Sequence, residues 1–354
     1  MAKKVFILGA GASVDAGFPV MENFLDKAED IKNGPDLSKD ERGAFNRVFD
    51  IRHKLKATAY AAQINLDNIE DVFSAIEMGR ILKKLADLDQ SEIDQVHHDI
   101  EVLIGRTLDE CFVLERVGTG DDIFYPSRDY NAFSEEIKNA IADNSEQISI
   151  ITFNYDVALD YALIFNKIDF NYCLNEDDRE DSLHLLKLHG SLNWGFCNKC
   201  NMIDHFNVHE SIKPVRRRAT TKIRAAQDII TKVHRCGQQL VGPFLVPPTF
   251  NKTYRQTGIT NVWRMAARDL AEAREVYIIG YSFPSTDVFF HYLLALGTHS
   301  DTTIRKFVVA NPDQSVDKRF KSILGPGIIK RYSPLNVYFS DAINSRLFFQ
   351  PSTS

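Results

Sequence analysis

The feature that most constrains this chain is an apolar run that ends in a glycine-rich turn close to its start. The run Val5-Phe6-Ile7-Leu8 is continuous, as expected for a strand buried on both faces of a parallel sheet. Gly9-Ala10-Gly11-Ala12-Ser13 follows directly, and Val14–Ala16 can begin a helix. Glycine lets a backbone approach a pyrophosphate closely, and a helix N-terminus offers it N–H groups. The segment therefore predicts a phosphate-binding loop, with the Ser13 hydroxyl as a further donor.

The spacing of this loop departs from the common dinucleotide and nucleotide-triphosphate patterns. The third glycine is Gly17, six residues after Gly11, and Phe18-Pro19 follows it. No Gly-Lys-Ser/Thr sequence is present, which excludes a Walker-type loop. A tight strand-to-helix turn without a ligand therefore stays open as the plainer interpretation.

Further apolar runs predict the remaining strands of the same sheet. They are Ile148–Phe153, Leu183–Leu188, Phe244–Val246, Val276–Ile279 and Phe307–Ala310. Helical patterns separate several of them, and this alternation is typical of α/β proteins. We expect a Rossmann-like, doubly wound parallel sheet.

Two stretches interrupt this alternation. Residues 40–145 contain few strand signals but show helical periodicity over Asn68–Leu88, Ile93–Leu114 and Ser134–Ala142, with Ser134 as the expected cap. Residues 194–241 are irregular. We therefore expect a nucleotide-binding domain formed by residues 1–39 and 146–354, a helical insertion at 40–145, and a small module at 194–241 inserted in that domain.

Composition limits the classes of protein that fit. The 354 residues carry a net charge of -6, which argues against broad, nonspecific nucleic-acid binding. No stretch approaches the roughly 18 apolar residues of a membrane span, and the first apolar run is too short for a signal peptide. Five cysteines, without the spacing of a disulfide framework, fit a reducing compartment. We expect a cytoplasmic protein.

Five motifs together resemble those of the sirtuin family, in the same order and each at the end of a predicted strand. They are Gly9-Ala10-Gly11-Ala12-Ser13 with Gly17-Phe18-Pro19, Thr152-Phe153-Asn154-Tyr155-Asp156, Leu188-His189-Gly190-Ser191, Gly280-Tyr281-Ser282 and Ala310-Asn311-Pro312. The resemblance implies a Rossmann-like domain that binds NAD, with a small inserted module and a helical one.

The resemblance is closer to a divergent bacterial sirtuin-like branch. The segments that carry it are Leu188–Trp194, Val246-Pro247-Pro248-Thr249 and Gly280-Tyr281-Ser282-Phe283-Pro284 with Asp287. That branch implies an NAD hydrolase that acts in anti-phage defence by NAD depletion. It also implies a homo-oligomer and, in some members, a HerA-type ATPase as a partner on a separate chain.

Three residues are the candidates for catalysis. Asn154, Asp156 and His189 follow neighbouring predicted strands, so all three can face the crevice beyond the carboxyl ends of the sheet. His189 can act as a general base on water or a ribose hydroxyl. Asn154 can orient water or the ribose, and Asp156 can assist. The alternatives are that His189 holds a turn and that Asp156 caps the next helix.

A second set of residues is expected to hold the nucleotide. Gly9, Ala10, Gly11, Ala12, Ser13, Phe18 and Pro19 would surround the pyrophosphate, and Gly280, Ser282, Asp287 and Asn311 would complete the site. Asn311 and Asp313 are candidates for the adenine-ribose side. The plainer interpretations are an Asn-Pro-Asp turn and, for Asp287, a place in the first turn of a helix.

The small module poses two further questions. Cys197 and Cys200 have the spacing of half a zinc site, and Cys236 offers a third ligand, while a fourth would come from His205, His209 or His234. We expect a degenerate zinc-ribbon-like module that folds without metal. The basic residues within 213–224 are Lys213, Arg216, Arg217, Arg218, Lys222 and Arg224, and they favour a solvated face over contact with nucleic acid, a partner or the NAD phosphates.

Three functions remain open from the sequence. An NAD hydrolase releases ADP-ribose and nicotinamide. A protein deacylase would use the same fold and the same His189, but needs a channel for an acyl-lysine. A module that senses NAD or ADP-ribose and regulates a partner needs no turnover. The presence of both Asn154 and His189 favours catalysis.

Overall fold

A seven-stranded parallel sheet forms the centre of the protein. The computed structural model describes residues 2–58, 62, 64–116, 123–143, 146–175, 182–212, 219–247, 257–284, 287–298 and 302–349. The strand order is β14-β13-β12-β1-β4-β6-β5, and every adjacent pair is parallel. The strands are β1 (Ala2–Leu8), β4 (Glu146–Thr152), β5 (Phe170–Asn171), β6 (Leu183–Lys187), β12 (Ala273–Ile279), β13 (Lys306–Ala310) and β14 (Tyr332–Leu335).

Strand β1 lies in the middle of the sheet, and its side chains Val5, Phe6, Ile7 and Leu8 are fully buried. Leu8 pairs with Thr152 of β4 on one side and with Ile279 of β12 on the other. The three strands therefore end level with one another. Their following loops meet at one edge, which is where α/β sheets bind ligands.

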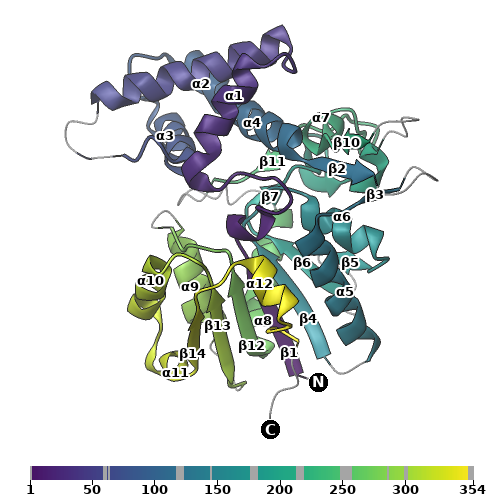
Figure 1. The fold of residues 1–354 in the computed structure, drawn as a ribbon. Helices are drawn as coiled ribbons and strands as arrows, with labels where there is room; N and C mark the ends of the chain where they lie inside the picture. The colour runs from purple at the N-terminus through teal and green to yellow at the C-terminus, as the bar shows by residue number, and fades with distance from the viewer. Residues whose placement is uncertain are drawn as a thin grey trace.

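Helices cover both faces of the sheet, which confirms the doubly wound prediction (Figure 1). On one face α5 (Arg128–Ala142) packs on β4 and contacts α6 (Ala158–Phe165) and α12 (Phe339–Asn344). On the other, α8 (Thr257–Glu272) packs on β1, β6 and β12 and contacts α9 (Val288–Gly297). Helices α10 (Ser315–Ile323) and α11 (Pro326–Ile329) connect β13 to β14.

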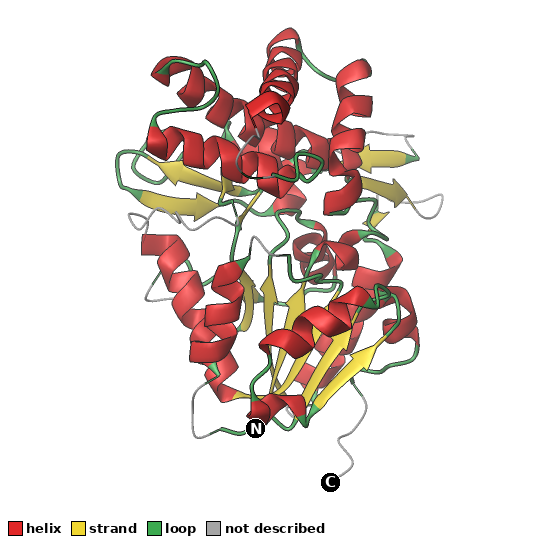
Figure 2. Ribbon diagram, turned by 90° about the vertical axis from the view of Figure 1, so that its left-hand side faces the viewer, coloured by secondary structure: helices red, strands yellow, loops and turns green. Residues whose placement is uncertain are grey.

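A layer of four helices lies above the carboxyl edge of the sheet (Figures 1 and 2). It consists of α1 (Phe24–Asn33), α2 (Lys39–Thr58), α3 (Ile69–Leu82) and α4 (Gln90–Cys111). Asp89 and Glu92 form a capping box that starts α4. The left-handed backbone of Lys83, with φ 52°, ends α3 six residues earlier than Asn68–Leu88 predicts.

Two sequence expectations about single elements were wrong. Helix α5 starts at Arg128, so Ser134 lies inside it, buried, and does not cap it. Phe244–Val246 does not join the large sheet, because β11 (Phe244–Leu245) pairs antiparallel with β7 (Gly190–Ser191) in a separate two-stranded sheet. A short apolar run does not specify which sheet it joins.

The remaining small elements of the described residues belong to two further sheets and four short helices. Strands β8 (Trp194–Cys197) and β9 (Met202–His205) form a hairpin, and β10 (Thr220–Lys222), β2 (Val113–Arg116) and β3 (Phe124–Tyr125) form a three-stranded sheet. The short helices are η1 (Ala10–Ser13), η2 (Met21–Asn23), η3 (Val208–Ser211) and α7 (Ala225–Ile229). Within the described residues, no helix is long and apolar enough to cross a bilayer.

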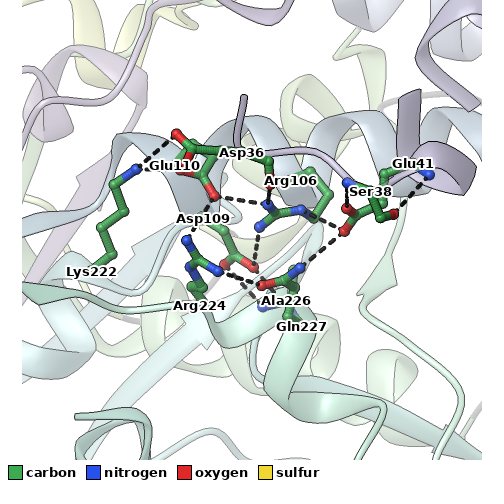
Figure 3. A network of polar contacts seen from close by, with 10 residues as sticks. All are labelled: Asp36, Ser38, Glu41, Arg106, Asp109, Glu110, Lys222, Arg224, Ala226 and Gln227. Carbon is green, nitrogen blue, oxygen red and sulfur yellow. Dashed lines mark hydrogen bonds and ion pairs between the residues drawn. The ribbon is translucent and has the colours of Figure 1, made fainter. Parts of the chain in front are cut away.

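A buried ionic network fastens the helical layer to the segment that carries β10 and α7 (Figure 3). Arg106 of α4 lies 2.7 Å from Glu41 of α2 and 2.8 Å from Glu110. Glu110 also contacts Lys222 and lies 3.5 Å from Arg224. Lys222 and Arg224 of the basic run thus have a structural role, while Lys213, Arg216, Arg217 and Arg218 lie outside the described residues.

The same network reaches the start of α7. Both carboxylate oxygens of Asp109 accept backbone N–H bonds of 3.0 Å, from Ala226 and Gln227. The Gln227 side chain donates to Glu41 at 2.9 Å. The helices α2, α4 and α7 therefore meet at one point. The buried guanidinium of Arg106 there is compensated by the carboxylates of Glu41 and Glu110.

Asp269 of α8 provides a test of the packing on the sheet. Its side chain is fully buried, 2.8 Å from His184 Nδ1 on β6 and in contact with Lys3 on β1. Burial alone would raise the pKa of Asp269, but the hydrogen bond and charge of His184 and the Lys3 ammonium lower it below its usual value. The folded-state pKa is thus depressed, so this stabilisation is present at neutral pH and is lost as the pH falls.

We expect Asp269→Asn to lower the free energy of unfolding by about 3–5 kcal/mol at pH 7, because it removes the buried carboxylate that contacts both Lys3 and His184. The difference from the wild type should narrow near pH 3, because Asp269 binds a proton in the unfolded chain there and the carboxylate stabilises the folded state less. Urea unfolding at both values measures this. Glu272→Gln, which alters an exposed partner of Lys3, should cost less than about 1 kcal/mol. An equal loss at both pH values would contradict the prediction.

Candidate functional site

The loops after β1 and β12 touch through their backbones. Gly9 donates its N–H to Ile279 at 3.0 Å, and Gly11 donates to Gly280 at 2.9 Å. A Cβ atom on Gly9 would lie 2.5 Å from the Tyr281 Cα, and one on Gly11 would lie 2.8 Å from the Gly280 Cα. Gly280 itself has a φ of 61°, which favours glycine. These glycines are therefore needed for the close approach of the two loops, whether or not a ligand binds there.

The glycine loop does not lead into the α-helix predicted at Val14–Ala16. Ala10–Ser13 forms one short 3-10 turn, η1, and the chain then reverses at Gly17, which has a φ of 91°. The first α-helix begins only at Phe24. The reversal directs the chain into the helical layer. The only helical turn that directly follows β1 is therefore η1, which has four residues.

Ser13 is the centre of a buried hydrogen-bond cluster. Its hydroxyl donates to Asp156 Oδ2 at 2.7 Å, accepts from Asn154 Nδ2 at 3.0 Å and lies 2.9 Å from the Tyr130 hydroxyl. Asn154 Nδ2 also donates to the Gly9 carbonyl at 2.9 Å. Three predicted site residues, from the loops after β1 and β4, are therefore in direct contact.

Two hydrogen bonds hold the Asp156 side chain. Oδ2 accepts from Ser13, and Oδ1 accepts from the Ala158 N–H at the start of α6, at 3.1 Å. Burial raises the pKa of Asp156, and the nearby Lys187 ammonium and the Ser13 hydrogen bond oppose that effect. The carboxyl group thus joins the Ser13 cluster to the start of α6, whose N-cap position is held by Val157.

Tyr130 is a member of this cluster that the sequence interpretation did not include. It lies in the first turn of α5, is 1% exposed, and reaches Ser13 from the far side. Burial raises the pKa of Tyr130 well above its usual value, so the hydroxyl keeps its proton. Starting the predicted helix at Ser134 left Tyr130 outside it; the Asp129-Tyr130 pair after Ser127 is the signal that marks the true start.

His189 lies in a second cluster beside the first. Its ring meets Phe153 edge-on, with centroids 5.1 Å apart, and its Nε2 is 3.9 Å from Asp287 Oδ1. The Tyr281 hydroxyl donates to the other oxygen of Asp287 at 2.6 Å, and the Tyr281 ring stacks on Phe153 at 4.4 Å. The His189 and Asp287 side chains are each 2% exposed.

One loop joins the two clusters. The segment between β4 and α6 sends Asn154 and Asp156 to Ser13, and it sends Phe153 and Tyr155 to His189. Alternate side chains along this extended segment thus point to opposite sides. The arrangement brings Ser13, Asn154, Asp156 and His189 to a single edge of the sheet, as expected for residues that follow parallel strands.

A buried lysine fixes this loop from behind, and the sequence interpretation missed it. Lys187 of β6 is 1% exposed, and its ammonium donates to the Asp156 carbonyl at 2.5 Å and to Asp160 at 3.0 Å. From Asp160 the hydrogen bonds continue through buried side chains to the turn after His189: Tyr172, Asn193 and Ser191. The turn and the loop are therefore held at a set spacing.

The remaining predicted nucleotide residues lie in different surroundings. Phe18 is buried against Phe112, with centroids 5.3 Å apart, and Pro19 is also buried, so both anchor the helical layer. Ser282 is exposed. Asn311 donates to the Tyr281 carbonyl at 3.3 Å and also forms the Asn-Pro-Asp turn by accepting from the Asp313 N–H.

A pocket of about 460 Å³ opens beside Asn311 at the ends of β13 and β14. Asn311, Asp313 and Ser315 supply polar groups to it, and Val309, Pro334 and Leu335 supply apolar walls. Its position at the carboxyl edge, next to Tyr281, places it on the side of the sheet where the sequence expected the adenine ribose.

The cysteines of the small module converge on a histidine. The ligand atoms of Cys197, Cys200, His234 and Cys236 all lie within 4.8 Å of one another. The Cys197 and Cys236 sulfurs are 3.6 Å apart, close to the roughly 3.8 Å that tetrahedral zinc with 2.3 Å bonds requires. The hydrogen bond from His234 lowers the pKa of Cys236 to about 6, so this thiol is a thiolate at neutral pH. His234 completes the set, whereas the sequence left the fourth ligand open.

Comparisons by sequence find no relative of this chain: no protein-family model matches it, and no curated protein does. Several solved Sir2 structures are similar to it over most of its length. A Sir2 homologue in complex with ADP-ribose is 16% identical, with a TM-score of 0.42, over 99% of this chain and 96% of that one. A Sir2 protein bound to a propionylated peptide is 13% identical, with a TM-score of 0.38, over 98% and 92%. At these values the likeness carries no argument about function.

The contact between the two glycine loops gives a prediction about stability. We expect Gly280→Ala to lower the free energy of unfolding by about 1–3 kcal/mol, because its Cβ would strike the Gly11 and Ala12 backbone in a left-handed conformation. Chemical denaturation measures this. Gly327→Ala, which has open space around it, should change stability by less than about 0.5 kcal/mol. Equal effects of the two substitutions would show that the loops do not depend on this contact.

The four-ligand cluster gives a prediction about metal, and it reverses the expectation of a metal-free module. We expect purified protein to hold about one zinc ion per chain by elemental analysis, and Cys236→Ser to lose it and melt at a lower temperature. Cys111→Ser, at a cysteine of α4 outside the cluster, should keep the metal. Wild-type protein without zinc would restore the original expectation.

Proposed function

We propose that this chain is an NAD glycohydrolase, which converts NAD and water into ADP-ribose, nicotinamide and a proton. The observation that carries the proposal is the convergence of Ser13, Asn154, Asp156 and His189 at the carboxyl edge of β1, β4 and β6. A general base, an amide and a buried carboxyl group lie there beside the glycine loop that the sequence predicts to hold the pyrophosphate. The sequence resemblance to sirtuins supports NAD as the substrate.

The residues divide the work along the length of the dinucleotide. The pocket beside Asn311 takes the adenosine end, and the loop Gly9–Ser13 lies against the pyrophosphate. Asn154, held by Ser13 and Gly9, orients the nicotinamide ribose or the attacking water. His189 then takes the proton from water or a ribose hydroxyl as positive charge grows on the anomeric carbon. Asp156 keeps Ser13 and the start of α6 in place.

The deacylase alternative is less well supported by the segment around β11. The Val246 N–H donates to the His189 carbonyl at 2.8 Å, and the Val246 carbonyl accepts from the Tyr155 hydroxyl at 2.9 Å. Both backbone groups of this residue are thus engaged by the site itself. A substrate peptide pairing as a strand at that position would have to displace one of them.

The biological setting follows the resemblance. We propose that the hydrolysis serves bacterial anti-phage defence by NAD depletion, in the cytoplasm and in a homo-oligomer. A HerA-type ATPase on a separate chain is the partner that the resemblance suggests. The four-helix layer, which lies above the carboxyl edge of the sheet (Figure 2), is the surface we assign to such contacts.

Nicotinamide release from NAD tests the proposal directly. We expect release without any peptide, and no increase when an acetylated peptide is added. Release that depends strictly on the peptide would overturn the hydrolase in favour of the deacylase. NAD binding without release in either condition would favour the sensing alternative.

Substitutions at the two clusters test the assignment of residues. His189→Ala and Asn154→Ala should each lower the rate by about 10²–10⁴-fold, the range for loss of a positioned general base or its partner. Calorimetric NAD binding and the circular dichroism spectrum should persist. His98→Ala, a histidine of α4 that is 61% exposed, should keep full activity. Near-normal turnover in either site variant would remove that residue from the mechanism.

A further inference from the structure

Asp287 occupies an unusual place for an aspartate. It occupies the N-cap position of α9 after β12, where its side chain makes no capping hydrogen bond, and it is buried. One of its oxygens accepts a 2.6 Å hydrogen bond from Tyr281, and the other faces His189 Nε2 at 3.9 Å. A buried carboxylate is costly unless charged or hydrogen-bonded partners compensate it. His189, the histidine assigned as the base, lies within reach of this carboxylate.

We propose that Asp287 is the positioning residue of this site: it orients the His189 ring and stabilises the imidazolium that forms when His189 takes a proton. The sequence suggested that Asp287 contacts the nucleotide, and this role replaces that one. Tyr281 acts one step further back, because its hydroxyl fixes the carboxylate and its ring stacks on Phe153, which touches His189. The kinetic part of the inference rests on the proposed hydrolysis.

The proton balance is simple. Nε2 of His189 is the ring nitrogen that lies 3.9 Å from Asp287, which leaves Nδ1 to take the proton in the proposed reaction. Water adds to the anomeric carbon as the bond to nicotinamide breaks, and the proton of that water passes to Nδ1. The imidazolium then lies beside a carboxylate, and both side chains are buried, which strengthens the attraction between them. The proton leaves to solvent after ADP-ribose is released.

Other titratable groups lie near His189 and Asp287, and the test has to separate them from Asp287. Tyr155 contacts the His189 ring and Tyr281 contacts Asp287. Burial raises the pKa of each tyrosine well above its usual value, so both stay neutral. Glu70 of α3 acts on both tyrosines through its charge, and Glu101 of α4 acts on Tyr155. Glu70→Gln is therefore the matched control for loss of one negative charge near the site.

The direct experiment follows the His189 imidazole by NMR titration of the full chain, with His189→Gln used for assignment. In the wild type we expect the His189 pKa above its ordinary value of about 6.5, because the carboxylate outweighs burial. Asp287→Asn should lower it by about one unit or more, and Glu70→Gln should shift it by less than half as much. A wild-type pKa at or below 6.5, or equal shifts in the two variants, would overturn the proposal.

The kinetic experiment measures nicotinamide release against pH. Asp287→Asn should lower kcat about 10–100-fold at pH 7, leave KM within about twofold, and move the acidic limb of the profile to lower pH. Asp287→Glu, which keeps the charge, should restore part of the rate. A raised KM with unchanged kcat would instead indicate a nucleotide contact and would overturn the proposal. If the wild type releases no nicotinamide, the proposed function fails, while the NMR titration still decides the role of Asp287. If Asp287→Asn does not fold, the wild-type titration decides it.

Discussion

The backbone contact between the loops after β1 and β12 is the constraint on which the rest of the site depends. Gly9 and Gly11 meet Gly280 and Tyr281 at distances that no side chain would allow. Because the loops are fixed against each other there, Ser13 is directed to one side and Tyr281 to the other. Ser13 then hydrogen-bonds to the loop after β4. Tyr281 hydrogen-bonds to Asp287, and Asp287 in turn lies 3.9 Å from His189. One close approach thus sets the positions of both polar clusters.

The site is also an example of buried charge made tolerable by pairing. Asp156, Asp160 and Asp287 are each nearly inaccessible, and each has a partner: the Ser13 hydroxyl, the Lys187 ammonium and the His189 ring, respectively. Such pairs add little to stability compared with apolar packing, but removing one member is expensive. Their value here is geometric, because they hold a loop that carries alternating functional side chains.

The sheet could be predicted well from apolar runs, and the exceptions are instructive. The buried strands β1, β4, β6, β12 and β13 coincide closely with the predicted runs. Strand β14 was not predicted, because Tyr332–Leu335 lies at the edge, is largely exposed and contains a proline. The two-residue β5 gives no periodic signal. Phe244–Leu245 gave a run but joined another sheet.

Part of the site could be predicted and part could not, for a physical reason. Asn154, Asp156, Ser13 and His189 follow strands, and parallel strands bring such residues together. Tyr130 reaches Ser13 from a helix whose start the sequence misplaced. Lys187 lies in a predicted strand, but no local pattern marks its contacts with Asp156 and Asp160. His234 was one of three histidines that the sequence could not tell apart as the fourth ligand. Arg106 is similar, since its carboxylate partner Glu41 is distant in the chain. Contacts of this kind depend on packing in three dimensions, and the sequence of one chain carries no local mark of them.

The helical layer leaves and rejoins the sheet domain at almost the same point. A Cβ on Gly17 would lie 3.1 Å from the Cys111 carbonyl, and Phe18 packs on Phe112. The chain therefore enters and leaves the four-helix layer at neighbouring positions, and the number of residues in the layer does not alter the spacing of the strands below it. Such a cassette can be enlarged, shortened or exchanged in the course of evolution without moving β1 against β4. The chemistry at the sheet edge and the contacts made above it are then free to diverge at different rates.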